Sequence, residues 1–507
     1  MTEIYWYEHA SLPLLALLQL LPLVGAAVLY WFGEGRFIVS IGRVFAVAEL
    51  CLAIALYRGL DATVPTLQYA EWLGGVGLLS YHAAADGVTV LFVMLVALIV
   101  LLLSLYILVR ELAAPRRLLM LLLIMEAVLM SQLVTVNLLW FVVASIAEIG
   151  LIGYLLWFWA TSPAKGRMLA RFYQFQGIGL LLLLLGTLII GWNHADATGR
   201  WSFDLLDLAG VPVAATVAPM AFFLFFYGLG VRIPIFPLHG WLPVVAQHGN
   251  VAVAPAFLLG IKVGIYGLVR YVLPILPQAV LEWQNFVVGF AAAGVFYAAL
   301  LAFQQSDLRR LLAFAVISHT SLLVIGLFAL HPLGFQGSLL LTVNFGLAVT
   351  AMLFMTGFVY RRTRTTALSR LGGLFDRIPF IGMAFLIGAL AIVGMPGTPG
   401  FDAAHLVLEA SIEKFGALPS VAVALGNVIA AGFLLYAFQR AFLAPKPVGQ
   451  TGGVERASRM ELLIALVAVG VLLAAGFYLE PWLKLVESSS HALAGHFGHN
   501  AVAGAHP

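Results

Sequence analysis

Apolar runs of similar length recur along the whole chain, and each is bounded by charged residues, glycine or proline. A helix of roughly 20 apolar residues is long enough to cross a bilayer. On this basis we expect an all-α integral membrane protein with about 14 transmembrane helices, in which residues 1–507 form one polytopic domain. The expected spans are approximately 12–32, 36–57, 86–109, 117–135, 137–160, 170–191, 214–238, 253–273, 283–304, 310–330, 337–360, 378–414, 419–442 and 460–480.

Composition supports a membrane protein and excludes several other classes. Of the 507 residues, 63% are hydrophobic and 10% are charged, whereas soluble domains carry about 25% charged residues. A disordered chain would also be more polar. The net charge of +3, without a long basic run, excludes a nucleic-acid partner. The single cysteine, Cys51, cannot hold an iron–sulfur cluster or form an intrachain disulfide. We therefore expect no cofactor, metal or catalytic residue on this chain.

The C-terminal segment, residues 486–507, is small and polar. It contains four histidines, His491, His496, His499 and His506. We expect a solvated terminus, with a metal-binding tail as the alternative.

The placement of basic residues predicts the orientation of the chain. Lysine and arginine cluster in alternate loops, for example at Arg116 and Arg117, at Arg309 and Arg310, and between Arg361 and Arg377. The other loops are acidic, and the positive-inside rule places the basic loops in the cytoplasm. We therefore expect a multi-pass protein of the plasma (inner) membrane, with both termini on the outer, periplasmic face.

Two of the apolar segments contain prolines and glycines that interrupt a helix. The prolines remove backbone donors in the middle of the seventh and twelfth segments, which lipid alone does not tolerate. Paired broken helices about 160 residues apart indicate the two halves of a transporter-like fold. The alternative is a pair of loops between shorter helices. The residues concerned are Pro234, Pro237, Pro396, Gly397, Pro399 and Gly400.

Ionisable residues inside the spans are candidates for function, because burying them in lipid is costly. A lysine or carboxyl group buried without a fixed partner can take up and release a proton as a neighbouring charge moves. The alternative is a set of static ion pairs or of side chains that reach the interface, and we favour it for Glu49 and Arg270, near span ends. The candidates for a proton path are Glu126, Glu148, Arg232, Lys262, His319, Asp402, His405 and Glu409.

Four stretches resemble one known family, the antiporter-like membrane subunits of respiratory complex I. The likeness is strongest to the M type, whose mitochondrial relative is subunit 4. The stretches are VRIPIFPLHGWLP from Val231, KVGIYGLVR from Lys262, AFQQSDLRRLLAF from Ala302 with the following Ser318 and His319, and GMPGTPGF from Gly394.

The resemblance implies two inverted five-helix repeats, over residues 117–273 and 283–442, each a candidate proton half-channel. It implies that Glu148 pairs with the residue at the helix 7 lysine position, which here is Arg232, and that Lys262 relays the proton inward. Arginine does not release its proton at physiological pH. The histidine expected in helix 11 falls at Phe345, and the acidic exit residue of helix 12 falls at Ala404.

Three functional hypotheses follow from these residues. The first is a proton-translocating subunit of a complex I-type NADH–quinone oxidoreductase, in which partner membrane and peripheral subunits carry the redox work. The second is a membrane subunit of a related assembly: a hydrogenase-type complex, a cation/proton antiporter or an inorganic-carbon uptake complex. The third is a structural paralogue that does not pump.

The sequence also predicts how the charged residues are arranged. Glu148 and Arg232 are expected within salt-bridge reach. Lys262 is expected to be the central proton carrier, with Gly260 and Gly264 leaving room for water beside it. From Lys262 a proton is expected to pass to His319 and then towards Asp402, His405 or Glu409.

Overall fold

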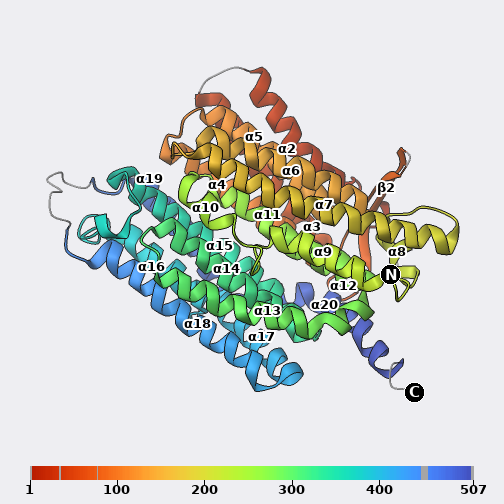
Figure 1. The fold of residues 1–507 in the computed structure, drawn as a ribbon. Helices are drawn as coiled ribbons and strands as arrows, with labels where there is room; N and C mark the ends of the chain where they lie inside the picture. Colours follow the sequence, from red (N-terminus) through yellow and green to blue (C-terminus); the bar gives the residue numbers. More distant parts are fainter. Residues whose placement is uncertain (1–2, 33–35, 77, 447–454, 504–507) are drawn as a thin grey trace.

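The computed structural model describes residues 3–32, 36–76, 78–446 and 455–503, and most of them are helical (Figure 1). Within this part, twelve helical segments are long and apolar enough to cross a membrane. The integral-membrane helical fold is thereby confirmed, whereas the expected count stays a prediction. The segments are α2 (Leu14–Trp31), α3 (Arg36–Gly59), α4 (Gly87–Arg110), α5 (Pro115–Val134), α6 (Leu138–Trp159), α7 (Lys165–Thr198), α11 (Ala254–Gly267) continued by η1 (Leu268–Val272) and α12 (Leu273–Ile275), α13 (Pro277–Phe303), α14 (Leu308–Leu327), α15 (Pro332–Thr363), α18 (Ala417–Phe438) continued by η3 (Gln439–Leu443), and α19 (Arg459–Phe477).

Two shorter apolar helices are the first halves of the interrupted segments. Helix α9 (Ala218–Arg232) is followed by a turn and by α10 (Leu242–His248), and α16 (Pro379–Val393) is followed by α17 (Pro399–Phe415). Both segments are interrupted as predicted, but Pro399 and Gly400, which were expected in the second break, form the first turn of α17, where proline is tolerated because the N–H it lacks has no partner within the helix. Gly394 and Gly397 both have φ of 87°, a conformation that glycine adopts without strain.

Side chains satisfy backbone carbonyls that the interruptions expose. The Trp241 indole donates to the Val231 carbonyl at 2.8 Å, and the Asn344 amide donates to the Ala391 carbonyl at 2.9 Å. Helix ends buried without such partners would be unstable in a membrane. The helix ends at both interruptions are therefore stabilised by specific side-chain hydrogen bonds.

A small sheet lies outside the helical bundle, which the all-helical expectation did not include. Strand β1 (Glu3–Tyr5) pairs in parallel with β2 (Leu67–Val76), and β2 pairs with β3 (Leu79–Ala85) as an antiparallel hairpin. The hairpin connects α3 to α4 at the end of the bundle where the described N-terminus lies (Figure 1). The short elements α1 (Trp6–His9), α8 (Leu205–Gly210) and η2 (Leu368–Arg370) complete the fold.

The expectation of a solvated C-terminal tail is wrong for its described part. Helix α20 (Glu480–Ala503) packs against the start of α4, where the Leu485 carbonyl lies against Gly87. Leu493 and Phe497 are buried, and Ser488 donates to the Ala62 carbonyl at 2.7 Å. The apolar residues spaced along this polar segment give it one face that packs on the bundle. His506 lies outside the described residues.

The centre of the bundle is formed by α11 with its continuation, and by α15. In each, 94% of the apolar window is buried, against 28% for α3 and α19. Helices α4 and α14 pack beside them. Lys262 on α11 and Phe345 on α15 therefore lie in the middle of the molecule.

Candidate functional site

Glu148 and Arg232 form a buried ion pair, which confirms the predicted pairing. Glu148 lies on α6, and Arg232 is the last residue of α9, directly before the interruption. The two side chains are 1% and 5% exposed. The guanidinium also donates to Ser145 Oγ at 2.7 Å and lies 5.7 Å from the centre of the Phe141 ring. The interruption thus fixes a permanent cation beside Glu148.

The glycines of α11 make room for this pair rather than for water beside Lys262. A Cβ atom on Gly260 would lie 2.3 Å from Glu148 Oε1, and one on Gly264 would lie 3.2 Å from Arg232 Cβ. Residues four apart share a helix face, whereas residue 262 lies about 200° around the helix from residue 260. The expectation that these glycines leave space at the ammonium group is therefore wrong.

Lys262 lines a small internal cavity on the other side of α11. The cavity has a volume of about 20 Å³, which is enough space for a single water molecule. Its lining includes His319 and Thr320 from α14 and Phe345 and Thr350 from α15. Among the described residues, Lys262 has no acidic side chain within ion-pair distance. The structure thus brings Lys262 and His319 to one cavity.

His319 connects this cavity with the second interruption. Its Nε2 lies 3.1 Å from the carbonyl oxygen of Ile392, one residue before the end of α16. Its ring packs against Phe345, with 4.8 Å between the ring centres. Phe345, at the position where the resemblance implies a histidine, therefore walls the cavity with an apolar ring.

Asp402, His405 and Glu409 are all exposed on α17. Ala403 and Val407 are buried on the opposite face, and Gly337 of α15 packs against them. None of the three polar side chains lines the cavity of Lys262 and His319. The structure does not bring them to His319, and their part in a proton path stays a prediction.

Three further buried residues, Arg270, Glu126 and Glu49, differ in their partners. Arg270 donates to Asp86 Oδ1 at 2.5 Å and to Thr89 Oγ1 at 2.8 Å, which confirms its interpretation as half of a static ion pair. Glu126 and Glu49 are both 0% exposed, and their carboxylate oxygens accept no hydrogen bond from any described residue. Glu49 was expected near a span end, but it lies well inside α3.

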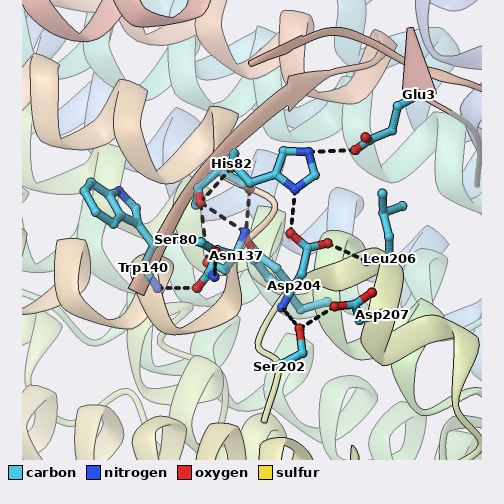
Figure 2. Close-up of polar contacts among 11 residues, drawn as sticks. Glu3, Ser80, His82, Asn137, Trp140, Ser202, Asp204, Leu206 and Asp207 are labelled. Atoms are coloured by element: carbon cyan, nitrogen blue, oxygen red, sulfur yellow. Dashed lines mark hydrogen bonds and ion pairs between the residues drawn. The ribbon is translucent and has the colours of Figure 1, made fainter. Parts of the chain in front are cut away.

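A polar cluster joins the sheet to the helices outside the membrane spans (Figure 2). His82 on β3 lies between two carboxylates: its Nδ1 is 2.5 Å from Asp204 Oδ2 and its Nε2 is 2.7 Å from Glu3 Oε1. The three residues are far apart in sequence, and nothing local marks them. Sequence reasoning missed the cluster for this reason.

The charge of His82 makes this cluster sensitive to alkaline pH. Burial lowers the pKa of His82, but hydrogen bonds and charge interactions with Asp204 and Glu3 outweigh it and raise the pKa to about 9. A histidine whose pKa is raised on folding stabilises the folded protein most at a pH below its pKa in the unfolded chain, about 6.5. This stabilisation is lost as the pH rises through the folded-state pKa of about 9.

We expect the melting temperature of the purified protein to fall between pH 7 and pH 10. His82→Gln should remove this dependence and cost roughly 1.5–3 kcal/mol at neutral pH, the value of hydrogen bonds to charged groups. His331→Gln is the control, because His331 and its acidic partner Glu413 are both partly exposed. An unchanged pH profile in His82→Gln would contradict the assignment.

No group of three or more histidine, cysteine, aspartate or glutamate side chains in the described part of the chain is placed to hold a metal ion.

Comparisons with known proteins agree on one family. Residues 153–430 match the family model described as "NADH:quinone oxidoreductase/Mrp antiporter, TM". NADH-quinone oxidoreductase subunit M of Escherichia coli is 30% identical over 342 residues, 66% of each chain and thus just under two thirds of that relative. F(420)H(2) dehydrogenase subunit M of Methanosarcina mazei is 26% identical over 95% of this chain and 98% of that one. A chain of "Respiratory complex I from Thermus thermophilus with bound NADH" superposes with a TM-score of 0.86 at 28% identity, covering 96% of this chain and 100% of the other.

Proposed function

The chain belongs to the NADH:quinone oxidoreductase/Mrp antiporter transmembrane family, and from that premise we propose that it is the proton-translocating, antiporter-like membrane subunit of a complex I-type NADH–quinone oxidoreductase. The observation that carries this proposal is the succession of buried polar groups from the Glu148–Arg232 pair across α11 to Lys262 and His319. The redox centres would lie on partner subunits, and this chain would hold no cofactor.

Each buried group has a part that its chemistry allows. Arg232 keeps its proton, so it acts as a fixed counter-charge for Glu148. Lys262 has no acidic partner within ion-pair distance, and burial disfavours a charged amine, so Lys262 is the group that exchanges a proton. His319 receives the proton through the shared cavity and passes it towards the second interruption. Asp402, His405 and Glu409, on the exposed face of α17, would then accept the proton beyond the second interruption.

Matching features about 160 to 170 residues apart support two repeats, over residues 117–273 and 283–442. Asn137 and Asp307 each cap a helix N-terminus with their side chain, and they form isolated β-bridges with Asp204 and Ala367. Interrupted helices follow in both halves. Each half then ends near a π-helical turn, η1 in the first and η3 in the second.

The proposed location is the plasma (inner) membrane, with both termini and the His82 cluster on the outer face. The basic ends of α4 and α15, with Arg110, Arg361 and Arg362, would face the cytoplasm under the positive-inside rule. This orientation is compatible with an even number of spans.

Identification of the partner chains tests the assignment. The chain, purified with an affinity tag from its native membrane in mild detergent, should bring down NADH-oxidising and quinone-binding subunits. Inverted vesicles from the same membrane should acidify when given NADH and a quinone. Recovery with hydrogenase or carbon-uptake subunits instead would favour a related assembly. A dependence on F(420)H(2) as donor would do the same, because F(420)H(2) dehydrogenase subunit M of Methanosarcina mazei aligns with 95% of this chain.

A further inference from the structure

Two buried carboxyl groups lie apart from the succession of Glu148, Arg232, Lys262 and His319, and one of them, Glu126, is a predicted proton-path residue whose part that succession does not explain. Glu49 on α3 and Glu126 on α5 are both 0% exposed, and all four of their carboxylate oxygens lack a hydrogen-bond donor among the described residues. Both residues precede the segment that matches the family model. An isolated ionised carboxylate is among the costliest groups to bury, so this arrangement requires an explanation.

The register of the two helices brings these carboxyl groups to one level. Helices α3 and α5 pack together and run in the same direction, because an antiparallel α4 separates them along the chain. A Cβ atom on Gly42 would lie 2.7 Å from Leu119 Cδ2. Seven residues, or two helical turns, carry each chain forward by about 10 Å on the same face. That step leads from Gly42 to Glu49 and from Leu119 to Glu126.

The electrostatics agree with this register. Glu49 lies close enough to Glu126 that negative charges on both carboxyl groups would repel each other. The face that joins them is made of small and apolar side chains, including Ala46 at 0% exposure. The two carboxyl groups therefore face each other across the contact between α3 and α5.

Helix α2 adds a backbone acceptor at the same level. Leu29 of α2 lies against Gly42, with 3.0 Å from its Cδ1 to the Cβ position. Because α2 runs in the opposite direction, two turns back from Leu29 lead to Pro22, which is buried inside the helix. Proline has no N–H, so it offers no helical hydrogen bond to the carbonyl of Leu18, four residues earlier. That carbonyl can accept a hydrogen bond from a protonated carboxyl group.

Among the side chains that the structure describes on the surrounding helices, no cation compensates the pair. On α3 the Arg43 guanidinium is engaged by Ser40 Oγ at 2.6 Å and by the Val39 carbonyl, and Arg58 lies at the far end. Arg110 of α4 and Arg116 and Arg117 of α5 lie at helix ends, away from the pair. Glu148 of α6 is already paired with Arg232. Lys262 of α11 lines a separate cavity.

We propose that Glu49 and Glu126 form a proton-binding site in which at least one carboxyl group is protonated and donates its O–H to the other. Two adjacent carboxylates cannot both remain ionised in apolar surroundings, because each charge disfavours the other. When one oxygen releases the proton the facing oxygen accepts it, so the number of protons in the pair is conserved. The ligand is a proton rather than a metal cation. The site does not require that Lys262 pump.

Infrared spectroscopy of the purified assembly tests the site through the C=O stretch of protonated carboxyl groups. The native protein at neutral pH should show a band that shifts on exchange into D2O. Glu49→Gln and Glu126→Gln should each displace the band of the remaining carboxyl, because its partner has become an amide. The double variant should lose the band. Both substitutions are neutral and close in shape, so the assembly should survive.

Three comparisons make the result decisive. Glu413→Gln, at a carboxyl that is 63% exposed, should leave the band unchanged. Pro22→Ala, which restores an N–H for the Leu18 carbonyl, should shift the band without removing it. Replacement of Na+ by choline should have no effect.

Any of three outcomes would overturn the proposal: a double variant with the native spectrum, single variants that leave the other band undisplaced, or a band that appears only when sodium is withdrawn. The last outcome would identify a sodium site. Because these spectra are recorded on the resting protein, they fail or succeed independently of proton translocation.

Discussion

Replacing Lys262 with arginine is expected to abolish proton translocation through this chain while the assembly stays intact. Both side chains are cationic, but arginine does not release its proton at physiological pH. The neighbouring cation, Arg232, cannot substitute for the same reason. The loss of a group that transfers a proton typically costs about 10²–10⁴-fold in rate. We therefore expect a decrease of about 10²-fold or more in the flux that depends on this chain.

The measurement is proton uptake by proteoliposomes that contain the purified assembly, driven by its own electron donor. Lys484→Arg is the matched control, because Lys484 forms an exposed ion pair with Glu480 on α20 and lies far from the cavity. Lys262→Gln tests the same step without the added bulk of arginine and should be equally inactive. Native flux in Lys262→Arg would show that the lysine is a structural counter-charge, and would favour the non-pumping alternative.

The second large effect is expected for Glu148→Gln, which should impair assembly as well as transport. The substitution leaves the Arg232 guanidinium buried, with Ser145 as its remaining partner. Removing one member of a buried ion pair typically costs about 3–5 kcal/mol. The purified variant should therefore melt at a lower temperature, and less of the chain should be recovered in the assembled complex.

A double-variant cycle separates two contributions to the lost stability: the loss of the ion pair itself, and the cost of leaving the Arg232 guanidinium buried without a counter-charge. In Glu148→Gln with Arg232→Gln neither residue is ionised, so much of the stability lost in the single variant should return. Glu111→Gln is the control, since that carboxylate is 79% exposed and is 3.7 Å from Arg361. A native melting temperature in Glu148→Gln would mean that the pair contributes nothing to the fold.

The residues that could be assigned from sequence were those whose local surroundings already reveal their state. Pro234 and Pro396 lie inside apolar runs, and the loss of a backbone donor there requires an interruption whatever packs around it. The pairing of Glu148 with Arg232 could be predicted from the resemblance because the motif fixes which residue ends the broken helix. Lys262 could be recognised as buried from the apolar run around it, but the sequence did not show which neighbouring helices its side chain faces.

Other assignments failed because they depend on which faces of distant helices meet. Glu49 looked like a span-end residue, yet the contact of Gly42 with Leu119 brings it opposite Glu126. His82, Glu3 and Asp204 come from three separate segments that only the outer sheet and the start of α8 bring together. The polar tail gave no signal of helix α20, because its few apolar residues matter only once α4 is beside them.

The sequence by itself determined that the chain is a helical membrane protein, where two of its helices break, and that Glu148, Arg232 and Lys262 lie inside apolar segments. These properties follow from local composition, since a bilayer requires apolar length and satisfied backbone groups from each segment separately. Tertiary structure alone decided which groups face Lys262, Glu49 and His82. Each residue turns a helix by about 100°, so on α11 Gly260 meets Glu148 whereas Lys262 faces the cavity of His319. The register between two helices is set by how their side chains pack, which neither sequence determines alone.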